Sequence, residues 1–182
     1  LEMAVGNARE QRQHMAAVIV GQADPGMLNA TVGLLDFISG HWHLQQADGS
    51  FQEAGAGLTG VGAVGTVAST SIADVDGKSG PDLLIAGTDE NLNPTSTLYL
   101  QQSDGSFQEA GAGLTGVSYA STSIADVDGQ SGPDLLITGY DGSSRSTTLY
   151  LQQPDGSFQE AGAGLTEVSD ASASIEDMDQ DG

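Results

Sequence analysis

Apolar residues in this chain recur at alternate positions within short runs, a spacing typical of β-strands. In residues 97–101, Leu98 and Leu100 fall on one face and Tyr99 on the other, and residues 147–152 repeat this alternation. No helical spacing of apolar residues lies between these runs. The pattern therefore predicts an all-β fold.

Four strand-like segments make up a unit that recurs along the chain. The expected strands are 70–73, 83–86, 97–101 and 107–110 in one copy, and 122–125, 135–138, 147–152 and 158–161 in the next. An Asp-Gly pair, Asp104 with Gly105 and Asp155 with Gly156, separates the third strand from the fourth and favours a tight hairpin. Each unit is therefore expected to be four antiparallel strands.

The sequence Asp-Gly-Ser-Phe-Gln-Glu-Ala-Gly-Ala-Gly-Leu-Thr occurs at 48–59, 104–115 and 155–166, at a spacing of about 51 to 56 residues. Four strands in a repeat of this length are typical of a β-propeller blade. A solenoid of stacked parallel strands is the alternative, which the hairpins disfavour because they need antiparallel neighbours. We expect tandem four-stranded antiparallel blades of the propeller type.

The repeats divide the chain into five expected parts. These are an N-terminal extension with a short helix and a donor strand (1–30), a degenerate first blade (31–66), two repeat blades (67–118 and 119–169) and the start of a truncated blade (170–182). A propeller of roughly four blades exceeds this length, so we expect an incomplete ring. The runs 16–20 and 173–177 are expected to lack partners. We hypothesise that they join copies head to tail, as rings or filaments, or bind another protein.

Composition excludes several classes of function. Four Lys and Arg against 25 Asp and Glu give a net charge of −21, which repels nucleic acids and anionic membranes. No apolar run is long enough for a membrane-spanning helix. With no Cys and three His, the chain offers no disulfides, thiol chemistry or zinc spacing, and no catalytic constellation can be assembled, so we expect no enzyme activity.

Aspartates cluster between the first and second expected strands of each repeat. Carboxylates at positions one, three and nine of a glycine-containing loop can surround a hard cation such as Ca²⁺, which takes six to eight oxygens in irregular geometry. An EF-hand is excluded because its twelfth position is Ile85 or Ile137 here, and Mg²⁺ is disfavoured because it demands octahedral ligation. The candidate ligands are Asp74, Asp76 and Asp82 in one loop and Asp126, Asp128 and Asp134 in the next.

The acidic loop, the following Pro-Asp-Leu-Leu-Ile and the later Leu-Tyr-Leu-Gln-Gln-x-Asp-Gly-Ser-Phe resemble the FG-GAP and VCBS repeats over about residues 31–182. Those repeats build the calcium-binding propellers of integrin α-subunits and of many secreted proteins. The resemblance implies cation loops on propeller blades and an extracellular or cell-surface role in adhesion, structure or glycan association. It implies no single enzymatic activity.

The fifth position of the loop departs from that family, which usually has a third acidic residue there. Lys78 would repel a cation, so we expect the first loop to bind weakly, whereas the amide oxygen of Gln130 can serve as a ligand in the second. A third loop carries its early carboxylates at Asp177, Asp179 and Asp181. The alternative is that all the loops are metal-free turns held by Asx-type hydrogen bonds.

The sequence as a whole favours a non-catalytic, extracellular, calcium-stabilised scaffold with a structural or adhesive role. A glycan-binding module is the competing prediction, with Tyr99, Tyr119 and Tyr150 as stacking platforms. The alternative for Tyr99 and Tyr150, which fall at equivalent strand positions, is that they cover a neighbouring blade. Asn29 begins an Asn-x-Thr acceptor sequence for N-glycosylation.

Overall fold

The computed structural model describes residues 50, 58, 68–78, 80–162 and 164–176, together with the backbone of four strands that precede residue 54. All regular secondary structure in this part of the chain is β, as predicted. Within the same part, no helix has the length and apolar character needed to cross a membrane.

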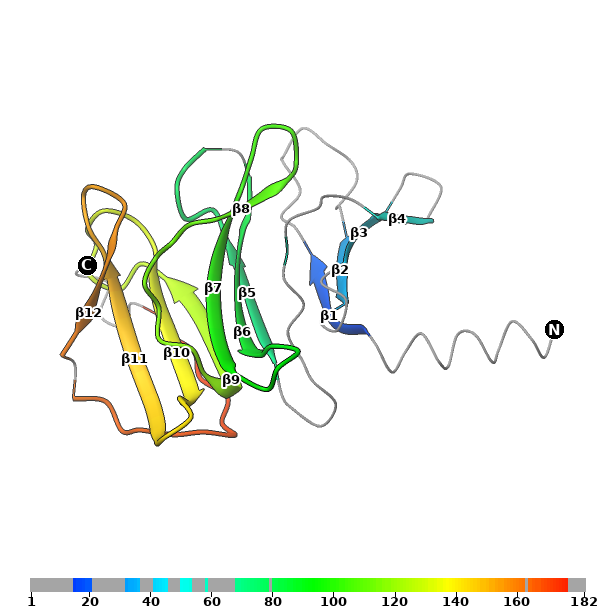
Figure 1. Cartoon of the computed structure of the whole chain (residues 1–182). Helices are drawn as coiled ribbons and strands as arrows, with labels where there is room; N and C mark the ends of the chain where they lie inside the picture. The colour runs from blue at the N-terminus through cyan, green and yellow to red at the C-terminus, as the bar shows by residue number, and fades with distance from the viewer. Residues whose placement is uncertain are drawn as a thin grey trace.

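Twelve strands form three antiparallel sheets of four, and each sheet follows the order of the chain (Figure 1). The first sheet contains β1 (Met15–Val20), β2 (Val32–Asp36), β3 (His41–Gln45) and β4 (Phe51–Glu53). The second contains β5 (Ser69–Ala73), β6 (Asp82–Thr88), β7 (Pro94–Gln101) and β8 (Phe107–Glu109). The third contains β9 (Ser118–Ala125), β10 (Asp134–Tyr140), β11 (Arg145–Gln152) and β12 (Phe158–Ala161).

The eight strands predicted from the two repeats are confirmed. Most extend beyond the predicted bounds, because the hydrogen-bonded ladders continue toward the turns between the second and third strands. The predicted hairpins are also present, with a hydrogen bond from the Gly105 amide to the Gln102 carbonyl, and Gly105 has φ 83°. A residue with a Cβ would be strained at that angle, so glycine is required in this turn.

The expectation that residues 16–20 have no partner in the chain is wrong. The run is a strand, β1, but it pairs antiparallel with β2, from Ala17 opposite Leu35 to Val20 opposite Val32. It therefore supplies the first strand of the first sheet, which satisfies backbone groups that a free strand would leave open. The short helix of the N-terminal extension was expected over residues 8–15. Residues 8–14 lie outside the described residues, and Met15 belongs to β1.

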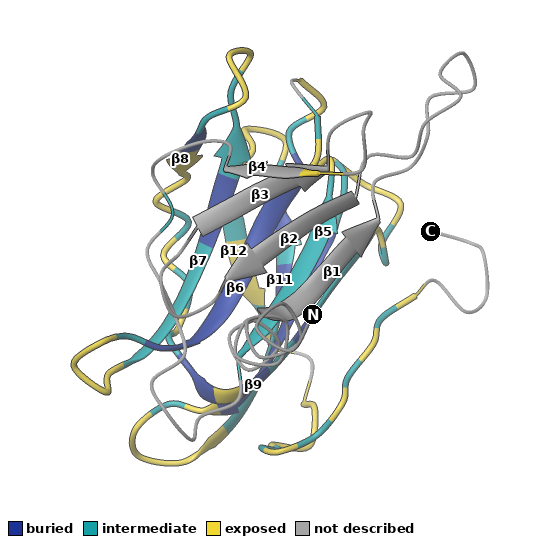
Figure 2. Cartoon of the chain, turned by 90° about the vertical axis from the view of Figure 1, so that its right-hand side faces the viewer, coloured by how far each residue is buried: buried dark blue, intermediate teal, exposed yellow. Residues whose placement is uncertain are grey.

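The hydrophobic core lies between the second and third sheets. Leu84 and Ala86 of β6 cluster with Leu135 and Ile137 of β10 and with Tyr150 of β11. β6 is buried along its whole length, as the dark blue strand in Figure 2 shows. Both faces of β6 are covered because its sheet lies between the other two, so the chain buries more of each strand than simple alternation predicts (Figure 1).

The first strands of the second and third sheets lie side by side, and hydroxyl groups join them. The Thr122 amide donates to Ser69 Oγ at 3.0 Å, and the Thr122 hydroxyl lies 2.8 Å from Ser71 Oγ. Residues 171–176 continue the series: the amides of Ala173 and Ile175 donate to Ser121 and Ser123. The prediction of a strand over 173–177 is wrong for residues 173–176, because serine hydroxyls take amides that a ladder would use.

Candidate metal centre

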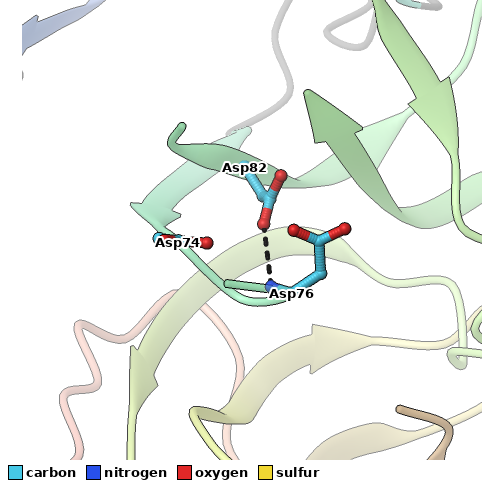
Figure 3. Close-up of side chains that lie close together, drawn as sticks. All are labelled: Asp74, Asp76 and Asp82. Atoms are coloured by element: carbon cyan, nitrogen blue, oxygen red, sulfur yellow. Dashed lines mark hydrogen bonds between the residues drawn. The ribbon is translucent and has the colours of Figure 1, made fainter. Parts of the chain in front are cut away.

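The two aspartate loops occupy the same place in neighbouring sheets. In the second sheet, Asp74 directly follows β5 and Asp82 is the first residue of β6, so the loop turns the chain from one strand into the next. This turn brings together Asp74, Asp76 and Asp82, each of which offers one carboxylate oxygen within 4.8 Å of the others (Figure 3). The predicted convergence is therefore confirmed for this loop.

The third sheet repeats the arrangement. Asp126 follows β9, Asp134 begins β10, and with Asp128 they bring one carboxylate oxygen each within the same 4.8 Å. In both loops the first aspartate is exposed, the second is half-buried and the third is buried. The geometry is a property of the repeat, since it is reproduced in two places.

Asp82 holds its loop closed by accepting backbone hydrogen bonds. Its Oδ2 accepts the amides of Val75 at 2.7 Å and Asp76 at 3.3 Å, the second of which is the dashed line in Figure 3. Its Oδ1 accepts a hydrogen bond from the backbone N–H of Gln101, at the end of β7, at 2.8 Å. With 0 % of its surface exposed, Asp82 ties both the loop and the third strand to the start of β6.

Asp134 makes the equivalent bonds in the third sheet. Its Oδ2 accepts a hydrogen bond from the backbone N–H of Val127, and its Oδ1 accepts one from the backbone N–H of Gln152 at the end of β11, each at 2.9 Å. Asp134 is also fully buried. The ninth position of the loop therefore has a structural role in both sheets, whether or not a cation is bound.

Burial raises the pKa of both ninth-position carboxyls. For Asp82, the hydrogen bonds from Gln101 and Val75 oppose the rise in pKa and the charge of Asp76 adds to it. For Asp134, the charges of Asp128 and Asp126 add to the effect of burial on the pKa. The neighbouring carboxylates thus repel one another, and a cation among them would remove this repulsion.

The outer aspartates of the first loop are ordered by turn hydrogen bonds. Asp74 Oδ1 accepts the Gly77 amide at 2.7 Å, and Asp76 Oδ1 accepts the Lys78 amide at 3.0 Å. The Lys78 ammonium also lies 3.1 Å from Asp76 Oδ2, while 73 % of its side chain stays exposed. An internal cation therefore neutralises part of the first cluster.

The second loop has the same turn bonds without that ammonium. Asp126 Oδ1 accepts the Gly129 amide at 2.8 Å, and Asp128 Oδ1 accepts the Gln130 amide at 2.9 Å. Gln130 is exposed, and these bonds engage its backbone. These are the Asx-type bonds of the metal-free alternative, but they leave each outer carboxylate a second oxygen for another ligand.

The donor set fits a hard divalent cation. Three carboxylate oxygens within one small volume are the ligand type that Ca²⁺ prefers, and it accepts backbone carbonyls and water for its remaining positions. The clusters contain no thiol or imidazole of the kind that zinc or copper would favour. Asp177, Asp179 and Asp181, and the acceptor Asn29, lie outside the described residues.

One feature of the site was not predicted from the sequence. It is the pair of third-strand glutamines, Gln101 and Gln152, whose backbone amides donate to the buried carboxylates. The signal for them is their identical place in the repeated Leu-Tyr-Leu-Gln-Gln. Tyr99 and Tyr150 are 3 % and 4 % exposed, so their prediction as glycan-stacking platforms is wrong, and Tyr150 clusters with Leu84 of the neighbouring sheet, as the alternative predicted. Tyr150 reaches the linker after β8, where its hydroxyl accepts the Thr115 amide.

Comparison with protein families, with curated proteins and with solved structures finds no match to this chain. The features of this chain that bear on function are therefore its fold and its two aspartate clusters.

Proposed function

We propose that this protein is a non-catalytic, extracellular β-repeat scaffold that Ca²⁺ stabilises. The observation that carries the proposal is the convergence of three carboxylates at the same turn of two adjacent sheets. A single acidic cluster on a protein surface is unremarkable without an ion. The two clusters have equivalent burial and equivalent backbone bonds, so neighbouring sheets offer two equivalent places for a cation.

Calcium would act on stability through the turn between the first two strands. The folded loop assembles the three carboxylates, whereas an unfolded chain holds them apart, so the cation binds the folded state preferentially. At a free Ca²⁺ concentration equal to Kd, such binding contributes about 0.4 kcal/mol per site, and at 100-fold above Kd it contributes about 2.7 kcal/mol. Extracellular modules bind Ca²⁺ with a Kd of about 10⁻⁴ to 10⁻³ M, which is the range we expect if the protein lies outside the cell.

The arrangement of the sheets supports a place among the FG-GAP and VCBS repeats and a propeller-like architecture. Each sheet is a four-stranded meander, the first strands of the second and third sheets adjoin, and a hydrophobic core lies between these two sheets. These are the relations expected of neighbouring blades. The described strands do not themselves close a ring, so the number of blades belongs to the proposal.

Head-to-tail assembly was expected because two runs, 16–20 and 173–177, were predicted to lack partners, and only the second run still supports it. β1 is paired within its own sheet, but Ser172 and Ser174 near the other end are exposed. Their counterparts, Ser121 and Ser123, accept amides from residues 171–176. The exposed pair can accept amides from a second copy or another protein in the same way. A monodisperse monomer in light scattering, at all concentrations tested, would contradict self-assembly.

The calcium proposal is tested by thermal melting of the whole chain, followed by circular dichroism. We expect added Ca²⁺ to raise the melting temperature and EGTA to reverse the change. The double variant Asp76→Ala with Asp128→Ala should abolish the response, because it removes one ligand side chain from each cluster. The control is Glu160→Gln, which removes a charge from the exposed face of β12. A wild-type melting curve that is indifferent to both reagents would overturn the proposal.

Glycan binding is the second candidate, and a different surface now supports it. Tyr140, Ser144, Arg145, Glu167 and Ser169 line a shallow depression of about 470 Å³. Tyr140 is 37 % exposed, and an exposed aromatic ring beside hydroxyls and charges suits a sugar. Tyr119, 39 % exposed, is the predicted platform that remains available. A glycan array should show saturable binding that Tyr140→Ala removes and Tyr119→Ala leaves intact; a silent array favours the scaffold.

A further inference from the structure

One glutamine side chain connects the two aspartate loops. Gln152 lies at the end of β11, and its Nε2 donates to the Val75 carbonyl of the preceding sheet's loop at 3.0 Å. Both residues are buried, Gln152 at 6 % and Val75 at 4 % exposure. A contact of this kind, out of reach of water, has no solvent partner to replace it when it breaks.

The position of this side chain depends on a glycine in its own loop. Gly132 has φ +117°, and a Cβ built there would collide with the Gln152 amide oxygen. The absence of a side chain at 132 therefore leaves room for the amide between the two loops. The first loop has the same pair, Gly80 with Gln101. The glycine–glutamine pair thus belongs to the repeat, and Gln152 reaches from its own sheet to the loop of the one before it.

Three hydrogen bonds, linked through one peptide group and one glutamine, connect one buried carboxylate to the other. In the Val75–Asp76 peptide group, the Asp76 N–H donates to Asp82 Oδ2, and the Val75 carbonyl accepts a hydrogen bond from the side-chain Nε2 of Gln152. The backbone N–H of the same Gln152 donates to Asp134 Oδ1 at 2.9 Å. Asp82 and Asp134 are the buried members of the two clusters. A single peptide group and a single glutamine therefore separate the two sites.

We infer that Gln152 couples the two aspartate loops, so that a cation bound in one loop raises the affinity of the other. This inference rests on the proposed calcium function. A cation in the first loop fixes Asp82 and so holds the Val75 carbonyl where Gln152 can donate to it. Gln152, once held, keeps its backbone amide on Asp134, so the second loop has less ordering left to undergo when it binds.

The coupling is measured by calcium titration calorimetry on the 182-residue chain. Asp128→Ala disables the second loop and reports the affinity of the first loop alone, and Asp76→Ala does the converse. The product of these separate affinities, compared with wild type, gives the coupling factor, which we expect to be about 5-fold. Gln152→Met keeps the length of the side chain but removes its donor, and should reduce the factor to one.

The matched control is Gln153→Met, because the Gln153 side-chain Nε2 donates to the nearby Leu151 carbonyl and, among the described residues, makes no hydrogen bond to another sheet. Gln152→Asn, which keeps an amide but shortens its reach, replaces the Met variant if that one does not fold. A second readout needs no calcium: amide hydrogen exchange at Val75 should accelerate in Gln152→Met and stay unchanged in Gln153→Met.

The outcomes separate the two proposals. If neither loop binds Ca²⁺, the proposed function fails, and the coupling of cation affinities fails with it. If both loops bind but a coupling factor of one is found in wild type, only the role of Gln152 is overturned. An unchanged Val75 exchange rate in Gln152→Met would likewise overturn the link between the loops while leaving calcium binding intact.

Discussion

The two aspartate loops have nearly the same sequence but differ in charge at one position. Both bring three carboxylates together, and both bury the ninth-position residue against backbone amides. They differ at position five, where Lys78 contacts Asp76 in the first loop and the second has the neutral Gln130. The comparison shows that the turn and its buried carboxylate set the geometry, while position five sets the charge that a cation meets.

The largest expected effect comes from removing the buried carboxylates. Asp82→Ala would leave three backbone amides without their acceptor and Asp134→Ala would leave two. Because each buried unsatisfied donor costs about 1–3 kcal/mol, we expect losses on the order of 3 kcal/mol, larger at Asp82. Urea unfolding in EGTA, followed by circular dichroism, measures the difference in the free energy of unfolding.

An exposed aspartate provides the control for that experiment. Asp104 accepts the amide and hydroxyl of Ser106 in the hairpin after β7, where water can replace it. Asp104→Ala should therefore destabilise the protein much less than either buried substitution. Equal losses at Asp82 and Asp104 would show that the loops do not depend on their buried carboxylates.

A smaller effect is expected from exchanging the residues at position five. Lys78→Gln removes the ammonium beside Asp76, and Gln130→Lys introduces one beside Asp128. Exposed ion pairs contribute up to about 1 kcal/mol, so each change should alter Ca²⁺ affinity by about fivefold, upward in the first loop and downward in the second. Calorimetry in the Asp128→Ala and Asp76→Ala backgrounds isolates each loop. Affinities that do not respond would mean that Lys78 swings away from the bound ion.

Much of this comparison could be predicted from local sequence. The strands, the hairpins at Gly105 and Gly156 and the meeting of Asp74, Asp76 and Asp82 all depend on residues close in the chain. Turn chemistry and two-residue alternation act over such short distances, so one sequence suffices to see them. The repeat then extends each prediction to the next sheet.

Contacts between sheets could not be predicted in the same way. Alternation in the third strand indicates one buried and one exposed face, but stacking covers both, so Tyr99 and Tyr150 are buried. Pairing of β1 with β2 spans a long connection, which no local signal encodes. The bond from Gln152 to Val75 joins residues 77 positions apart and depends on how two sheets stack. These features arise from tertiary packing and not from the pattern of a single repeat.

The smallest expected effect is on the pH dependence of stability, in which the buried aspartates of the loops differ from the exposed aspartates of the hairpins. Burial raises the pKa of Asp82 and Asp134, whereas the Ser106 and Ser157 hydroxyls and amides lower the pKa of Asp104 and Asp155. In calcium-free protein the buried pair binds protons more tightly when folded. Their contribution to stability therefore grows as pH falls through their raised pKa values and is complete below the unfolded value of about 3.9.

The hairpin pair acts in the opposite direction, because its stabilisation is present above the unfolded pKa and is lost as pH falls through the lowered values. Carboxyl carbon NMR titration should thus place Asp82 and Asp134 above the hairpin pair in EGTA. Ca²⁺ binds the ionised carboxylates, so saturating calcium should bring the titrations of the buried pair down while Asp104 and Asp155 stay where they are. Buried carboxyls that titrate identically with and without calcium would place the ion elsewhere.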